Sequence, residues 1–342
     1  KVYPVNNLKE AVEFLNRPAT LPYTADFAQF AADALAEAEL DFADVKGQSL
    51  AKRALEIAAA GAHNILLIGP PGTGKSMTAM RLPGILPPMT FEETLEVSRI
   101  HSILGLLQDG NALLRAPPFR SPHHTISDVG LIGGGKDIRP GEISLAHNGV
   151  LFLDEFPEFK RHVLEVLRQP LEAGCINVSR AAGSATFPAR FMLCAAMNPC
   201  PCGRGDYELG CTCKLEEKRR YRQKISGPLL DRIDLTVELR QLSENELLSA
   251  PTGESSAVIR ERVLTARQLQ SQRFAARKIH CNSQMTSRDL QEFCRIDLKG
   301  QRLLKQAIAR FQLSPRAYDR ILKVARTVAD LAGAKDIGER HL

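Results

Sequence analysis

A glycine-rich segment, G-P-P-G-T-G-K-S, has the composition and spacing needed to bind the phosphates of a nucleotide. It matches the pattern G-x-x-x-x-G-K-[ST] and follows a continuous apolar run, residues 64–68. In such a loop the glycines let backbone N–H groups surround phosphate oxygens, Lys75 bridges the β and γ phosphates, and Ser76 ligates Mg²⁺. A Gly/Pro-rich turn that matches by chance is the alternative. The predicted nucleotide-binding residues are Gly69, Pro70, Pro71, Gly72, Thr73, Gly74, Lys75, Ser76, Met77 and Asp154.

Carboxylate and amide side chains directly follow two further apolar runs. Asp154 and Glu155 follow residues 149–153, and Asn198 follows residues 189–196. Ligands of open α/β sheets bind at the carboxyl ends of the strands, so we predict these side chains at one edge. There Asp154 would reach Mg²⁺, Glu155 would orient or deprotonate the attacking water, and Asn198 would hold the γ-phosphate or that water. The alternatives are a surface acidic pair and an asparagine that caps a turn before Pro199.

Two arginines are candidates for phosphate contacts. Arg316 falls in the first turn of a predicted helix, where a cation meets the unfavourable end of the helix dipole. A phosphate ligand would explain this broken local rule, although an exposed arginine at small cost is the alternative. Arg232 stands between two carboxylates, Asp231 and Asp234, so an internal salt bridge is as consistent with it as a catalytic finger.

Four of the eight cysteines are clustered in two C-x-C pairs. Four thiolates suffice for a closed tetrahedral Zn²⁺ site that cross-links a polar loop. The spacing is tighter than the usual C-x-x-C, and unligated or redox-active cysteines are the alternatives. The predicted zinc ligands are Cys200, Cys202, Cys211 and Cys213. The isolated cysteines are expected to be small core or surface residues, namely Cys175, Cys194, Cys281 and Cys294.

The elements that position these residues form an α/β fold. The chain of 342 residues is 44% hydrophobic and 25% charged, which excludes disordered, collagen-like and disulfide-rich miniprotein classes. Strand and helix patterns alternate to about residue 239, and only helical patterns follow, at 243–250, 255–277, 286–295, 299–311 and 314–331. This predicts a parallel-sheet phosphate-loop core followed by an all-helical lid. Helices are also predicted within 1–22 and over 27–40 and 50–61. No apolar run is long enough for a membrane span, so a cytoplasmic protein is expected.

Basic segments suggest contact with a polyanion, in line with the net charge of +6. Residues 176–190 predict an inserted β-hairpin whose Arg180 could contact DNA phosphates, although a solvated hairpin tip is the alternative. Residues 89–136 form a long basic insertion, in which His123 and His124 are expected to hydrogen-bond rather than bind metal. Residues 218–224 add a further positive stretch, although such runs are most often solvated.

These motifs, in this order, resemble the AAA+ ATPases of the magnesium-chelatase-like branch and, within it, the bacterial ComM (YifB) family. The segments that carry the resemblance are G-P-P-G-T-G-K-S, P-H-H-T-I-S, P-G-E-I-S-L-A-H-N-G-V-L-F-L-D-E, A-M-N-P-C-P-C-G, S-G-P-L-L-D-R-I-D and S-P-R-A-Y-D-R. The resemblance implies that Arg232 is an arginine finger acting on a neighbouring subunit's ATP and that Arg316 is the lid sensor. It also implies rings, usually hexameric, and a preceding domain similar to the Lon protease domain.

The residue patterns and the family resemblance together predict the organisation of the chain and its function. Residues 1–22 would be the tail of a preceding domain plus a linker, 23–240 the ATPase core with the cysteine loop at 198–214, and 241–342 the lid. We expect a ring-forming ATPase that couples hydrolysis to translocation on DNA, with helicase or branch-migration activity in homologous recombination during natural transformation. The expected cofactors are ATP, Mg²⁺ and Zn²⁺. A magnesium-chelatase-type ATPase subunit and a protein-remodelling ATPase are the alternatives.

Overall fold

The computed structural model describes residues 8–16, 40–107, 113–135, 138–180, 183–205, 210–248, 253–277 and 279–342. The helix predicted within residues 1–22 is present as α1 (Leu8–Asn16), in which no residue is buried. The helix expected over 27–40 lies outside the described residues, apart from its last position. Among the described helices, none combines the length and the apolar character that a membrane span requires.

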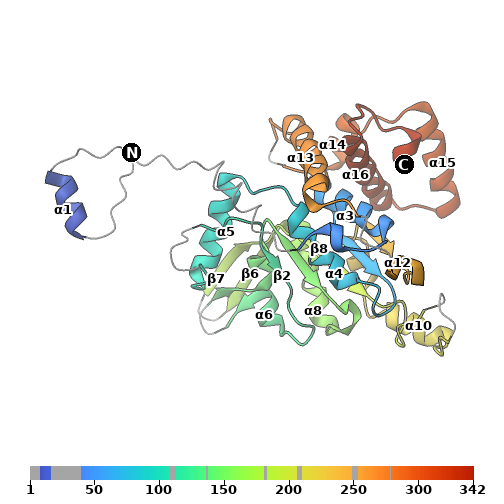
Figure 1. Ribbon diagram of the computed structural model, residues 1–342, viewed down its shortest axis with the longest axis horizontal. Helices are drawn as coiled ribbons and strands as arrows, with labels where there is room; N and C mark the ends of the chain where they lie inside the picture. The colour runs from blue at the N-terminus through green and yellow to red at the C-terminus, as the bar shows by residue number, and fades with distance from the viewer. Residues whose placement is uncertain are drawn as a thin grey trace.

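A five-stranded parallel sheet with the strand order β2-β5-β8-β1-β9 lies at the centre of the structure (Figure 1). Its strands are β2 (Phe119–Arg120), β5 (Val150–Leu153), β8 (Met192–Met197), β1 (Ile65–Ile68) and β9 (Leu235–Glu238). The predicted α/β class with a parallel sheet is therefore confirmed. The third apolar run becomes a strand only from Met192 onward, three residues later than its pattern starts.

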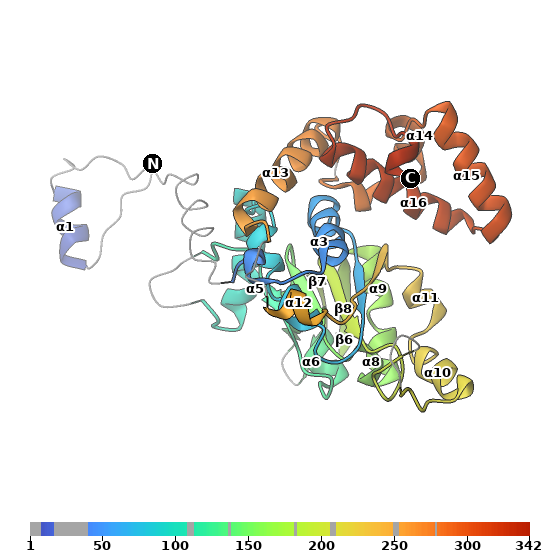
Figure 2. The same cartoon turned by 45° about the vertical axis from the view of Figure 1, so that its right-hand side comes forward.

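Alternate residues of the strands face two separate hydrophobic layers, as strand geometry requires. Leu67 and Phe152 pack beneath α3 (Ser49–Gly61) and α13 (Ser256–Arg273), whereas Leu66 belongs to the opposite layer. The opposite layer also buries side chains of α8 (Arg161–Glu165), next to α9 (Arg168–Ala173). Figure 2 shows α3 and α8 on opposite sides of the strands. Burial on both faces explains why the strand sequences read as continuous apolar runs.

The basic segment after the phosphate loop contains a helix that its sequence pattern did not predict, α5 (Phe91–Ile103). Thr90 and Glu93 form a reciprocal capping box at its start, and this T-x-x-E spacing was the available signal. The same region holds α6 (Asp128–Ile132), α7 (Glu142–Leu145) and a short pair, β3 (Gly133–Gly134) and β4 (Arg139–Pro140). The described residues also form the 3₁₀ helices η1 (Phe42–Asp44), η2 (Leu82–Ile85), η3 (Phe156–Glu158), η4 (Asn282–Gln284) and η5 (Glu339–His341).

The inserted hairpin is present as two antiparallel strands, β6 (Cys175–Arg180) and β7 (Gly183–Pro188). This confirms the hairpin prediction, with Ile176 and Val178 buried against the second face of the sheet. Arg180 ends β6, but its side chain lies outside the part of the chain that the structure describes.

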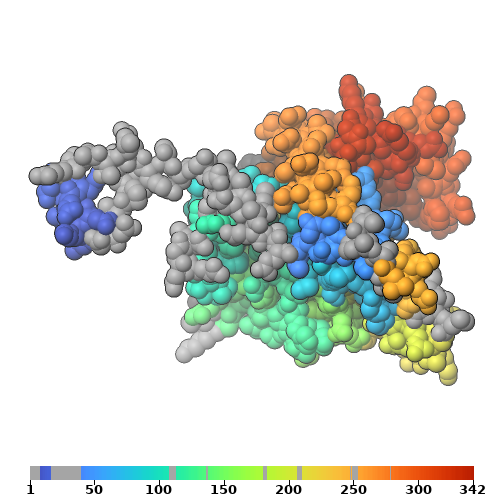
Figure 3. All heavy atoms as spheres, in the orientation of Figure 1, coloured from blue at the N-terminus to red at the C-terminus, as the bar shows by residue number. Residues whose placement is uncertain are grey.

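After β9 the described residues form helices and no further strand, the α-helices being α12 (Glu244–Leu248), α13, α14 (Ser287–Phe293), α15 (Leu298–Phe311) and α16 (Pro315–Leu331). The last three, together with Phe274 directly after α13, form a hydrophobic cluster of their own that includes Leu304 and Leu322. Of these helices, α13 and α16 pack against α3, and Figure 3 shows orange and red atoms next to the blue ones. The division into a tail, a core and a lid at residues 22 and 240 stays a prediction, and we refer to α13–α16 as the lid helices.

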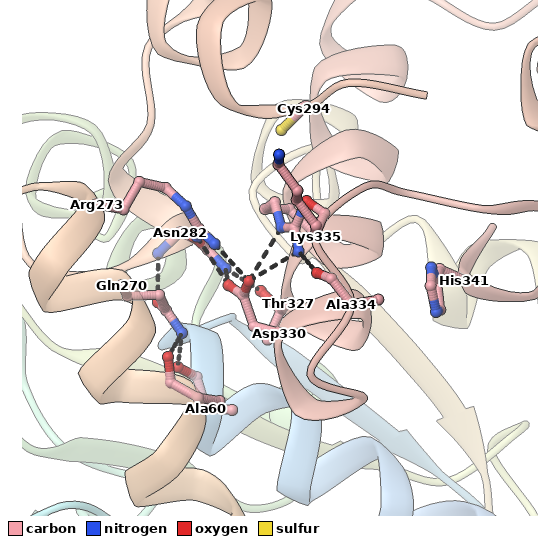
Figure 4. Close-up of polar contacts among 12 residues, drawn as sticks. Ala60, Gln270, Arg273, Asn282, Cys294, Thr327, Asp330, Ala334, Lys335 and His341 are labelled. Carbon is pink, nitrogen blue, oxygen red and sulfur yellow. Dashed lines mark hydrogen bonds and ion pairs between the residues drawn. The ribbon is translucent and has the colours of Figure 1, made fainter. Parts of the chain in front are cut away.

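A buried polar network joins the lid helices to one another and to α3 (Figure 4). The fully buried carboxylate of Asp330 accepts hydrogen bonds from Arg273 at 2.5 and 2.8 Å and from Asn282 at 2.8 Å. Gln270 of α13 donates to the carbonyl of Ala60 at 2.9 Å. Because a buried charge is costly unless it is paired, this network favours one arrangement of the lid on α3.

Candidate nucleotide-binding site

The phosphate loop connects β1 to α4 (Lys75–Ala79) and depends on its glycines. Gly72 and Gly74 have φ angles of 78° and 86°, in the left-handed region that side chains with a Cβ disfavour. At Gly69, a Cβ would lie 2.6 Å from the carbonyl oxygen of Leu239. The loop conformation therefore requires glycine at the positions that the motif specifies.

The Lys75 ammonium is buried inside the loop and has three acceptors. It donates to the carbonyls of Gly69 and Pro70 at 2.7 and 2.8 Å and to the Asn198 amide oxygen at 3.1 Å. Burial lowers the pKa of Lys75, and the nearby charge of Asp154 opposes that shift. Lys75 and Asn198, 123 positions apart in sequence, thus meet at the predicted edge.

Ser76 and Asp154 are in direct contact across the same edge. The Ser76 hydroxyl donates to Asp154 Oδ2 at 2.5 Å, and the Glu155 backbone N–H donates to Asp154 Oδ1 at 2.8 Å. A hydroxyl and a carboxylate in this position are an oxygen pair of the kind that Mg²⁺ selects. Asp154 and Ser76 therefore fit the magnesium site that the sequence predicts, with Met77 half-exposed on the next position of α4.

Glu155 is held by a contact that sequence reasoning missed. Its carboxylate lies 3.1 Å from His124 Nδ1, and its backbone has a φ of 50°, unusual for a residue with a side chain. The neighbouring His123 bonds the Thr125 hydroxyl at 2.9 Å, and the two imidazole rings are 4.1 Å apart. The histidines thus serve hydrogen bonding, as expected, but one of them acts on the candidate catalytic carboxylate.

The four clustered cysteines begin two residues after Asn198. Their sulfur atoms lie within 4.8 Å of one another, and all eight cysteines are free thiols. The isolated cysteines behave as expected, because Cys194, Cys281 and Cys294 are buried and Cys175 is half-buried. Burial raises the pKa of Cys294 to about 12, so this thiol is inert near neutral pH.

Arg232 lies in the turn between α11 (Gly227–Leu230) and β9 and not in the phosphate loop. Its guanidinium is ion-paired with Glu172 of α9 and donates to the Pro228 carbonyl. Its Nε is buried without a partner. An internal salt bridge is therefore present, but its partner is Glu172 and not one of the neighbouring carboxylates, and the finger role stays a prediction.

The lid helix α16 contacts the segment around Arg232 at two places. Arg320 donates to the carbonyls of Ile233 at 2.9 Å and Leu230 at 3.3 Å, on either side of Arg232. Further along α16, Thr327 bonds the buried ring of His63 at 2.8 Å, and the other His63 nitrogen lies 3.3 Å from Asp234. These contacts tie the lid to the segment that carries the candidate finger.

Arg316 is exposed in the first turn of α16, one helical turn before Arg320. Within the described residues, no hydrogen bond or ion pair joins it to the phosphate loop. The structure therefore places Arg316 on the helix that holds the Arg232 turn and does not bring it into contact with Lys75.

A cavity of about 510 Å³ adjoins the phosphate loop and was not indicated by any motif. Gln48 borders it and donates to the carbonyls of Arg240 at 2.7 Å and Thr73 at 3.2 Å. The lining residues are Gln48, Ser49, Leu50, Ile68, Gly69, Pro70, Pro199, Glu238, Leu239, Arg240 and Gln241. A nucleotide bound by the loop has room for its base and sugar there.

Comparison with protein families accounts for this arrangement. Residues 41–247 match the family model described as magnesium chelatase, subunit ChlI, and residues 253–342 match the model for its C-terminal part. The chain belongs to the magnesium-chelatase-like AAA+ family. This membership supports ATP hydrolysis, in agreement with the loop and carboxylate geometry.

Known relatives place the chain with the ComM and YifB members of this family. It is 46% identical to competence protein ComM of Haemophilus influenzae, over 99% of this chain and 66% of that protein. It is 46% identical to YifB of Escherichia coli, over 88% of this chain and 59% of that protein. The 38 kDa magnesium-chelatase subunit of Rhodobacter capsulatus is 28% identical over 46% of this chain and 50% of that protein. The chain thus spans less than two thirds of the length of ComM and YifB.

Proposed function

We propose that this chain is the motor part of a ring-forming ATPase that moves along DNA. The observation that carries the ATPase part is the convergence of Lys75, Ser76, Asp154 and Asn198 at the carboxyl edge of the sheet. The similarity to a protein named for competence supports a role in natural transformation. The activity that we propose there is helicase or branch migration in homologous recombination, in the cytoplasm.

In this proposal ATP lies along the phosphate loop with its base in the adjoining cavity. Lys75 exchanges one or more of its present acceptors for phosphate oxygens, and Ser76 and Asp154 hold Mg²⁺. Glu155 orients or deprotonates the attacking water, and His124 holds its carboxylate at the edge of the site. Asn198 acts on the γ-phosphate or the water from its position beside Lys75.

In the proposed assembly, usually hexameric in this family, two arginine side chains complete the nucleotide site. Arg232 leaves Glu172 and contacts the ATP of the neighbouring subunit, where an arginine stabilises the charge of the transition state. Arg316 acts as the lid sensor, and its place on the helix that holds the Arg232 turn supports a role at a subunit boundary.

The proposed path of DNA runs past the hairpin formed by β6 and β7. A ring would present Arg180 from every subunit to the same strand, and α10 (Leu215–Arg222) adds arginines and lysines near the cysteine loop. The proposal also includes one Zn²⁺ held by the four clustered cysteines.

The experiment that tests this function is ATP turnover by the purified protein with and without single-stranded DNA, at two salt concentrations. We expect turnover stimulated by DNA, and DNA affinity that falls with salt with a log–log slope of about −0.7 for each phosphate contact. Arg180→Ala should flatten that slope, whereas Lys305→Ala, an exposed lysine of the lid, should not.

Three results would contradict the proposal, each in a different part. Turnover that ignores DNA would favour a chelatase-type or protein-remodelling ATPase, since both share the nucleotide site. Absence of any turnover would overturn the ATPase itself. An unaltered salt slope in assembled Arg180→Ala protein would remove the hairpin from the DNA path.

A further inference from the structure

The four cysteine sulfurs already have the spacing of a tetrahedral metal site. Cys200 Sγ lies 3.3 Å from Cys202 Sγ and 3.8 Å from Cys211 Sγ, and Cys202 Sγ lies 3.7 Å from Cys211 Sγ. With Zn–S bonds of about 2.3 Å, the edges of a ZnS₄ tetrahedron are about 3.8 Å long. The set therefore surrounds a point that Zn²⁺ fits.

The loop that carries these sulfurs has little else to hold it together. None of its described residues from 199 to 214 belongs to the three hydrophobic clusters of the molecule. Cys200 is fully buried, and its sulfur accepts the Gly205 backbone N–H at 3.2 Å, which fixes the position of this sulfur within the loop. A cross-link through four ligands would give this polar segment the stability that apolar packing does not supply.

The same loop is packed against the phosphate loop. Gly203 has a φ of 85°, and a Cβ at this position would lie 2.8 Å from the Pro71 ring. At its start the loop continues directly from Asn198, whose amide oxygen bonds Lys75. The cysteine loop thus borders the nucleotide site on two sides, at Pro71 and at Asn198.

We infer that Cys200, Cys202, Cys211 and Cys213 bind one Zn²⁺, and that this metal clamps the nucleotide site by fixing Asn198 and supporting Pro71. The inference that zinc binds depends only on the geometry of the four sulfur atoms. The clamp rests on the proposed function, because it acts through ATP binding. The metal has no open coordination position and takes no part in the chemistry.

The first test measures metal rather than activity. Elemental analysis of the purified protein should find about one Zn per chain, and a mercurial reagent that modifies thiols should release it into a colorimetric zinc indicator. Cys211→Ser combined with Cys213→Ser should remove the zinc, whereas the control Cys175→Ser should retain it. Zinc-free wild-type protein with all thiols reduced would overturn the site.

A second variant tests the clamp without removing a ligand. Gly203→Ala should retain zinc but weaken binding of a fluorescent ATP analogue about tenfold, because the added methyl group collides with Pro71 and strains a left-handed backbone. Gly105→Ala is the matched control, since it also has a positive φ but open space around its Cβ position. Unchanged nucleotide affinity in Gly203→Ala would overturn the clamp.

The outcomes separate this inference from the proposed function. Wild-type protein that contains zinc but binds no ATP analogue would overturn the ATPase and, with it, the clamp, while the metal site would stand. If the double cysteine variant does not fold, zinc release from the wild-type protein and the Gly203→Ala affinity still decide the two parts.

Discussion

The phosphate edge and the Arg232 turn differ in how complete they are within one chain. At the phosphate edge, Lys75 already bonds Asn198 and Ser76 already bonds Asp154, so nucleotide binding would need only an exchange of partners. At the turn, Arg232 is paired with Glu172, and its Nε is buried without a partner. The first site is pre-organised, whereas the second requires a rearrangement before it can act on anything else.

The two regions also differ in what holds them. The phosphate edge is built by consecutive strand ends of one sheet, so its geometry follows from the sheet itself. The turn is held from the lid by Arg320 and, through His63 and Thr327, by the middle of α16. The lid helix α16 therefore contacts the turn of Arg232 directly through Arg320 and indirectly through Thr327 and His63.

The largest effect is expected from the finger itself. Arg232→Ala should lower turnover by about 10³-fold or more if Arg232 completes a neighbour's site. Mixing this variant with Glu155→Gln subunits should restore activity, because an intact finger then meets an intact site. The check is steady-state ATPase of mixtures whose composition is confirmed by native mass spectrometry, and absence of recovery would contradict action between subunits.

The next effect separates binding from chemistry at the phosphate edge. Lys75→Ala should abolish measurable ATP binding, whereas Glu155→Gln should bind ATP normally and turn over about 10²–10⁴-fold more slowly. The reason is that Lys75 contacts phosphate before reaction and Glu155 acts on the water. Binding of a fluorescent ATP analogue, beside single-turnover hydrolysis, checks both, and equal loss of binding in the two variants would refute the assignment.

A smaller effect is expected at the joint between lid and turn. Arg320→Ala removes two hydrogen bonds from a charged donor and should lower kcat about tenfold, with the dissociation constant for ATP nearly unchanged. Arg320→Lys should recover part of the loss, and Arg302→Ala, an exposed arginine of α15, should have no effect. Equal losses in kcat and ATP affinity would show that Arg320 does not act through the finger.

The smallest effect concerns the partner that holds Arg232 in the single chain. Glu172→Gln should raise ATPase at low protein concentration by up to about fivefold, because an exposed ion pair contributes up to about 1 kcal/mol. The control Glu216→Gln breaks an ion pair with Arg219 on α10 and should leave activity unchanged. A decrease with Glu172→Gln would indicate that this carboxylate positions the finger for action.

Sequence reasoning was most successful where the chemistry follows directly from a strand. Residues such as Asp154 and Asn198 stand next to continuous apolar runs, so the parallel sheet alone brings them together. The phosphate loop adds glycines whose positive φ angles are needed wherever the motif forms. Both patterns lie within short segments of the sequence, and they can be recognised without knowing how the lid helices pack.

The contacts that escaped prediction join segments with no fixed spacing. His124 reaches Glu155 from a region read as an irregular insertion, and Arg320 reaches a turn 87 positions earlier in the chain. The edge strand β2 has two residues, too few for any periodicity. Such contacts depend on how the elements pack, which the hydrophobic pattern of each element alone does not specify.

The pairing of Arg232 with Glu172 has a consequence for how a ring would assemble. In the proposed ring the guanidinium exchanges one anion for another, a carboxylate of its own chain for the phosphates of a neighbour. If ATP strengthens the contact between subunits through this exchange, thermodynamic linkage requires that the contact strengthen ATP binding by the same factor. Nucleotide binding and subunit association would then be thermodynamically coupled, so a change in either would change the other.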